Sequence, residues 1–133
     1  MGNRSVLLVD DDEDLRQSVG ELVGILCGYD CVACDGLNEL VGARERALAC
    51  QAAIIDINLG AGRPSGLVVY DWLRAERFAG RILFLTGHAA THPLVRDAAS
   101  RVDADVLTKP IAADALRRAL ADSYSIPSAP SIA

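Results

Sequence analysis

The chain has 133 residues, which suits one compact domain and is too short for two ordinary ones. Hydrophobic residues make up 51% and charged residues 23%, so global disorder is excluded and a packed core is expected. The net charge of −5 argues against a duplex DNA-binding surface and suits a cation or a basic partner surface.

The apolar segments are too short for a secretion signal or a membrane span. The run near the N-terminus, Val6 to Val9, ends in acids, and no stretch approaches the roughly 20 apolar residues that a membrane helix needs. We therefore expect a soluble protein in the cytoplasm, with no direct contact to membrane or nucleic acid.

Short apolar runs alternate with segments of helical periodicity along the whole chain. The apolar runs predict strands over 6–10, 30–34, 52–57, 81–86 and 104–108. The helical spacing predicts helices over 12–26, 37–50, 67–77, 93–99 and 112–123. Gly28 is placed to end the first helix in a left-handed conformation, and Pro93 to begin the fourth. Residues 1–124 are expected to form one domain, and "SIPSAPSIA" (125–133) a flexible tail.

Five strands alternating with helices predict a doubly wound α/β fold with a parallel sheet. Right-handed crossovers leave few topologies, and the strand order 2-1-3-4-5 is the simplest of them. In such sheets a ligand site forms beyond the carboxyl ends of the strands, where the winding reverses between the first and the third strand.

The C-x-x-C spacing of Cys31 and Cys34 raises the possibility of zinc binding or redox chemistry. The two residues lie in a predicted strand, however, where positions three apart point to opposite faces. No histidine lies nearby in the sequence to complete a ligand set. We therefore favour small buried thiols over a metal or redox pair.

Carboxylates follow two of the predicted strands at the point where the winding reverses. Asp10 and Asp11 end the first strand, and Asp56 ends the third. Two like charges about 4 Å apart repel by about 4 kcal/mol at an effective dielectric near 20, and a divalent cation such as Mg²⁺ would relieve that repulsion. The neighbouring acids 12–14 are better explained as capping groups in the first turn of a helix.

Two further strand ends add a hydroxyl and an ammonium group to the same edge. The fourth predicted strand ends at Thr86, and the fifth leads to Lys109 and Pro110. Carboxylates, a cation, a hydroxyl and an ammonium group around one pocket can hold a multiply charged oxygen anion. The natural candidate is a phosphoryl group.

The segments "LLVDDDEDLR", "AAIIDINL", "LFLTGHA" and "VLTKP", in this order, resemble the receiver domain of two-component response regulators. The chemotaxis response regulator is the simplest member of that family. The resemblance covers residues 4 to about 122 and implies a flavodoxin-like (βα)5 fold. It also implies a cytoplasmic bacterial signalling protein that forms an aspartyl phosphate and later hydrolyses it, without being a conventional enzyme.

The resemblance implies a role for each site residue. Asp56 would accept the phosphoryl group from a phosphohistidine on a sensor histidine kinase or a histidine phosphotransfer protein. Asp11 would bind Mg²⁺ directly and Asp10 through water, while Asp56 and the backbone carbonyl of Asn58 complete the protein ligands.

Beside the metal ligands, the resemblance implies that Lys109 pairs with a phosphoryl oxygen and that Thr86 donates a hydrogen bond to another. The Lys109–Pro110 peptide would be cis. Asn58 and His88 would tune the lifetime of the phosphorylated state.

The chain departs from the family pattern at three places. Val106 occupies a position where the family usually has an aromatic switch residue. The loop 58–66, with the extra "GAGRP", is longer than usual and could contact the kinase or shield the phosphate. Asp12 is an additional acid, which could enlarge the negative field around the metal.

Several alternatives remain open from the sequence. The fold could serve as a pseudo-receiver that binds proteins without phosphorylation, or the chain could be a receiver cut from a hybrid histidine kinase or a larger regulator. A flavodoxin-like cofactor binder is less favoured, because acids replace the phosphate-cradling glycine loop after the first strand. The downstream partner is unknown, and we expect a monomer or a weak dimer.

Overall fold

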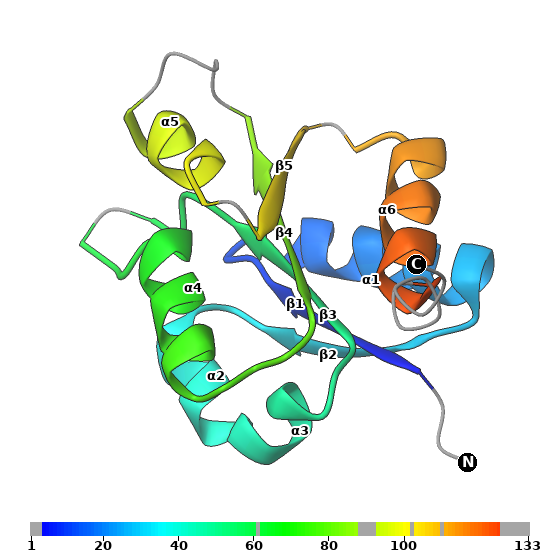
Figure 1. Cartoon of the computed structure of the whole chain (residues 1–133), viewed down its shortest axis with the longest axis horizontal. Helices are drawn as coiled ribbons and strands as arrows, with labels where there is room; N and C mark the ends of the chain where they lie inside the picture. The colour runs from blue at the N-terminus through cyan, green and yellow to red at the C-terminus, as the bar shows by residue number, and fades with distance from the viewer. Residues whose placement is uncertain (1–3, 61, 88–92, 102, 110, 126–133) are drawn as a thin grey trace, which may run out of the picture.

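The computed structural model describes residues 4–60, 62–87, 93–101, 103–109 and 111–125 and contains one five-stranded sheet (Figure 1). The strands are β1 (Ser5–Val9), β2 (Asp30–Cys34), β3 (Ala52–Asp56), β4 (Arg81–Thr86) and β5 (Ala104–Thr108). All neighbouring strands are parallel, in the order β2-β1-β3-β4-β5. The predicted fold class and strand order are confirmed.

Helices cover both faces of the sheet. They are α1 (Glu13–Cys27), α2 (Leu37–Gly42), α3 (Arg44–Leu48), α4 (Gly66–Ala75), α5 (Pro93–Ala99) and α6 (Ala113–Ser125). Figure 1 shows α1 and α6 on one side of the sheet and the other four helices on the opposite side. Within the described part of the chain, no helix combines the length and the apolar character needed to cross a membrane.

Each face of the sheet has its own hydrophobic core, because successive residues of a strand point to opposite faces. In β1, Leu7 and Val9 pack towards α2–α5, while Val6 and Leu8 pack towards α1 and α6. All four side chains are buried, as are all five residues of β3. Full burial of an aliphatic side chain of this size contributes about 1.5–3 kcal/mol, so β1 and β3 anchor the sheet.

Helix α1 begins and ends as the sequence predicts. The side chain of Asp12 accepts hydrogen bonds from the amides of Asp14 and Leu15, at 3.0 and 3.2 Å. At the other end, Gly28 has a φ of 71° and donates its amide to the carbonyl oxygen of Gly24. A glycine is favoured here because a side chain strains the left-handed conformation.

The prediction of one helix over 37–50 is wrong, because the chain forms two short helices there. The break falls at Ala43, whose φ and ψ of −105° and 23° are not helical. Gly42 precedes it, and a glycine inside a helix is less favourable than alanine by about 1 kcal/mol. Leu40 and Ala47 are nevertheless both fully buried, so each short helix contributes to the core.

Among the cysteines whose side chains the structure describes, Cys34 and Cys50 are buried and Cys31 is half-buried. Cys31 packs on the α1 and α6 side of the sheet, whereas Cys34 packs on the opposite side, so the C-x-x-C spacing does not make a pair. Burial raises the pKa of both thiols to about 11, which keeps them protonated at neutral pH. Together with Cys50 they are free thiols.

The first residue of α4 lies directly against the end of β3. Gly66 donates its amide to the carbonyl oxygen of Ile57 at 2.8 Å. A Cβ at Gly66 would overlap the carbonyl oxygen of Asp56 and lie 2.8 Å from the Cα of Ile57. Because these are backbone atoms, they cannot move aside without shifting Asp56.

We predict that Gly66→Ala lowers the free energy of unfolding by about 1–3 kcal/mol, the usual effect of overpacking. The matched control is Gly24→Ala in α1, where an added Cβ meets no atom within 4 Å. That change should raise stability by about 0.5–1 kcal/mol through helix propensity. Urea unfolding measures both, and equal effects of the two substitutions would contradict the close approach at Gly66.

Candidate functional site

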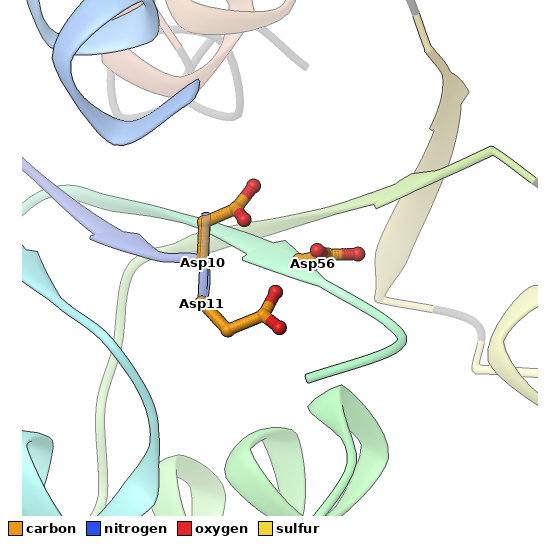
Figure 2. A group of neighbouring side chains, drawn as sticks. All are labelled: Asp10, Asp11 and Asp56. Atoms are coloured by element: carbon orange, nitrogen blue, oxygen red, sulfur yellow. The ribbon is translucent and has the colours of Figure 1, made fainter. Parts of the chain in front are cut away.

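Three carboxylates lie together at the ends of the two central strands (Figure 2). Val9 of β1 pairs with Ile55 of β3, so the next residues, Asp10 and Asp56, are neighbours across the sheet. Each of Asp10, Asp11 and Asp56 offers a carboxylate oxygen, and these oxygens lie within 4.8 Å of one another. Asp10 and Asp56 are buried, whereas Asp11 is exposed.

The two buried acids are held in the same way by the loops that follow them. Oδ1 of Asp10 accepts the amide of Asp12 at 2.9 Å, and Oδ1 of Asp56 accepts the amide of Asn58 at 3.2 Å. Each aspartate thus bonds the backbone two residues further on, a local turn that fixes the side chain. In both residues Oδ2 is left for other interactions.

Lys109 meets both of these remaining oxygens. Its Nζ lies 3.0 Å from Oδ2 of Asp56 and 3.6 Å from Oδ2 of Asp10. The ammonium group donates a hydrogen bond to Asp56 alone. Among the described residues, Oδ2 of Asp10 has no hydrogen-bond partner although it is fully buried. Within the described part of the chain, the site therefore contains a buried carboxylate oxygen that lacks a hydrogen-bond donor and has the ammonium group of Lys109 only at 3.6 Å.

The pKa of Asp10 reflects the burial of a carboxylate whose Oδ2 has no hydrogen-bond donor among the described residues. Burial and, to a smaller extent, the charge of Asp56 raise the pKa of Asp10 to about 6, against the lowering effects of the Asp12 amide and Lys109. Burial lowers the pKa of Lys109, but its hydrogen bond and its attraction to Asp56 outweigh burial, so that the net pKa is raised. The lysine stays charged, and the acids keep a strong demand for positive charge.

Thr86 ends β4 beside β3 and is almost fully buried. Its carbonyl oxygen accepts the amide of Lys109 at 2.8 Å, which fixes the backbone of the lysine relative to the threonine. Asn58 lies in the loop directly after Asp56, and its side chain accepts the amide of Gly60 at 3.1 Å. His88 and Pro110 lie outside the described residues.

Val106 lies half-buried in β5, opposite Phe84 of β4. An aromatic ring nevertheless borders this strand pair, because Tyr70 of α4 packs with its ring centroid 5.8 Å from that of Phe84. The hydroxyl of Tyr70 donates a hydrogen bond to Asp103, just before β5. The aromatic side chain that packs on Phe84 therefore comes from a helix and not from β5.

The sequence analysis did not identify Arg16, which binds the backbone at Asp10. Its Nη1 donates to the carbonyl oxygen of Asp10 at 2.7 Å. A cation near the start of a helix is opposed by the helix dipole, so an arginine there needs another stabilising contact. The unfavourable position of Arg16 near the start of a helix was the feature of the sequence that could have indicated this contact.

The family model described as "Response regulator receiver domain" matches residues 6–121. No curated protein sequence matches the chain.

Several solved structures share the fold. The signal receiver domain of a putative LuxO repressor protein from Vibrio parahaemolyticus has a TM-score of 0.79 at 24% identity, covering 98% of this chain and 97% of its own. The receiver domain of NtrX from Brucella abortus has a TM-score of 0.78 at 23% identity, covering 91% and 98%. The chemotaxis protein CheY4 from Vibrio cholerae has a TM-score of 0.76 at 22% identity, covering 92% and 99%.

The family match spans most of the chain, and the strand order and the helices on both faces agree with it. The chain therefore belongs to the family of response regulator receiver domains.

Proposed function

We propose that this receiver domain takes a phosphoryl group from a phosphohistidine onto Asp56 and thereby switches a surface that binds a partner. The donor would be a sensor histidine kinase or a histidine phosphotransfer protein. The observation that carries the proposal is the convergence of Asp10, Asp11 and Asp56, with Lys109 beside Asp10 and Asp56. Among the described residues, one buried carboxylate oxygen is left without a hydrogen-bond partner.

The residues at this edge fit a magnesium ion. The donors are carboxylate oxygens, the hard ligands that Mg²⁺ prefers, and the buried Oδ2 of Asp10 has no hydrogen-bond partner among the described residues. Asp11, Asp56 and the carbonyl of Asn58 would hold the ion directly, and Asp10 through water. Bound Mg²⁺ would supply neutralisation of the charge on the phosphoryl oxygens.

Asp56 and Lys109 would carry the transfer itself. A carboxylate oxygen of Asp56 forms a bond to phosphorus, while the bond from phosphorus to the donor's imidazole nitrogen breaks and that nitrogen keeps the electron pair. Lys109 then exchanges its contact with Oδ2 of Asp56 for a phosphoryl oxygen. Because the lysine is already held beside the acceptor, little rearrangement is needed.

Thr86 would couple phosphorylation of Asp56 to a change at the protein surface. Its hydroxyl would donate to a phosphoryl oxygen and draw the following loop inwards. The partner surface would consist of α5, β5 and α6, which follow Thr86 in the chain. With Val106 in place of an aromatic residue, packing between Tyr70 and Phe84 would take part in this coupling. A cytoplasmic location, as for the kinases that would serve it, is expected.

We predict that Asp56→Asn abolishes phosphorylation while the fold is retained. The measurement is intact mass after incubation with Mg²⁺ and acetyl phosphate, in which the unmodified protein should gain one phosphoryl group. Asp14→Asn, at an exposed acid, is the matched control and should label normally. Stoichiometric labelling of Asp56→Asn would refute the assignment.

We predict that Asp11→Ala weakens Mg²⁺ binding at least about tenfold, because it removes a direct carboxylate ligand. Without metal, the same change should leave stability unchanged or slightly higher, since it relieves repulsion near Asp10 and Asp56. Thermal melts with and without Mg²⁺ test both parts, with Asp14→Ala as the control. An equal Mg²⁺-dependent shift in Asp11→Ala and the unmodified protein would count against the metal site.

We predict that Asp10→Asn stabilises the metal-free protein above pH 6. The pKa of Asp10 is about 6 in the folded state, against an ordinary value of 3.8. The folded state therefore holds this proton more tightly, and stability falls as the pH rises from about 4 to 6. The full penalty above pH 6 is on the order of 1–3 kcal/mol.

Urea unfolding in EDTA at pH 4.5 and 7.5 measures this effect. The advantage of Asp10→Asn should be larger at pH 7.5 and should shrink when Mg²⁺ is added. An advantage that does not change with pH, or a loss of stability at pH 7.5, would show that repulsion at Asp10 is not the controlling factor.

A further inference from the structure

Arg63 joins the loop after Asp56 to the loop after β2. The loop turns sharply at Gly60 and Gly62, which have φ values of 112° and 74°, and the amide of Arg63 donates to the carbonyl of Gly60. The side chain of Arg63 leaves its own loop, and its Nη2 donates to the carbonyl oxygen of Asp35 at 3.0 Å. The same atom lies 3.6 Å from Oδ1 of Asp35.

The receiving loop is shaped for this guanidinium group. A Cβ at Gly36 would overlap Nη2 of Arg63, and the next nearest heavy atoms are Cζ and Nε of the same arginine. The φ of Gly36 is 169°, an extended conformation that any residue adopts. The amide of Asp35 donates to the side chain of Glu39, which holds this loop to α2. Glycine is therefore required at position 36 for this contact, because the guanidinium group of Arg63 occupies the space that a side chain would need.

The same arginine also borders the candidate metal site. A Cβ at Gly60 would lie 3.3 Å from Cδ of Arg63 and 3.6 Å from Oδ2 of Asp11. The stem of the arginine, the turn at Gly60 and the carboxylate of Asp11 are thus neighbours. Asn58, whose side chain accepts the amide of Gly60, belongs to the same loop. The loop that begins at Asn58 therefore lies close to Asp11 at Gly60.

The position of Arg63 matters more than its charge. Its side chain is 41% exposed, and the carboxylate of Asp35 offsets the guanidinium charge. Exposed charges of this kind are screened by solvent and salt, and such pairs contribute little to stability. The contact with Gly36 and Asp35, in contrast, fixes the loop geometrically.

We propose that Arg63 is a positioning residue for the cation site, because it ties the loop carrying Asn58 to the loop at Asp35 and Gly36. The tie keeps Gly60 against Asp11 and fixes the loop that begins at Asn58, so that the ligands are arranged before the ion arrives. The identity of the ion as Mg²⁺ rests on the function proposed above, whereas the tie between the loops does not.

A double-mutant cycle with two readouts tests the proposal. Arg63→Met removes the tie and the charge, while Gly36→Ala keeps the charge but displaces the guanidinium, a flexible tip that can move at little cost in stability. The readouts are amide hydrogen exchange of residues 58–63, 65 and 35–36 without metal, and Mg²⁺ titration. Arg44→Met, at another exposed arginine with an ion pair, is the control.

Both single variants should exchange several-fold faster in these two loops and bind Mg²⁺ about tenfold more weakly, the low end of the range for groups that orient metal ligands. The double variant should resemble Arg63→Met alone, because Gly36→Ala has nothing left to displace. Arg44→Met should leave both readouts unchanged.

Two results would overturn the proposal. Unchanged exchange in either single variant would show that Arg63 does not hold the loop. Tighter Mg²⁺ binding in Arg63→Met with no change in Gly36→Ala would show that the arginine acts through its charge. If the unmodified protein does not bind Mg²⁺ at all, the proposed function fails, and the exchange cycle still decides whether Arg63 holds the two loops together.

Discussion

The repulsion between carboxylates at the ends of β1 and β3 is the constraint on which the site depends. The pairing of these strands brings Asp10 and Asp56 side by side, and burial deprives both of water. A single ammonium group, from Lys109, hydrogen-bonds Asp56 and stays 3.6 Å from Asp10. The single positive charge of Lys109 does not neutralise three carboxylates, so this edge of the sheet keeps an excess of negative charge. In a structural ion pair, by contrast, the two charges balance.

The sheet and the placement of the acids could be predicted because both follow from local patterns. Continuous apolar runs mark buried parallel strands, and right-handed crossovers then limit their order. Once the order is known, residues at the ends of neighbouring strands must meet, as Asp10 and Asp56 do. The predicted helix over 37–50 failed because apolar spacing continues across Gly42 although the backbone does not.

Other features could not be predicted because they depend on contacts between distant segments. The close approach of Gly66 to the backbone of β3, and that of Arg63 to Gly36, arise only when the loops are folded against one another. The contact of Tyr70 with Phe84 is of the same kind, since one residue belongs to a helix and the other to a strand. A single sequence carries no periodic signal for such contacts.

The central strands give the site its shape through the main chain. Asp10 and Asp56 continue strands that are buried on both faces, and a backbone hydrogen bond sets Lys109 beside Thr86. The outward surfaces of the helices contribute little to this geometry. Those surfaces can therefore diverge in sequence while the arrangement of the strand ends is kept, in line with a shared fold at 24% identity.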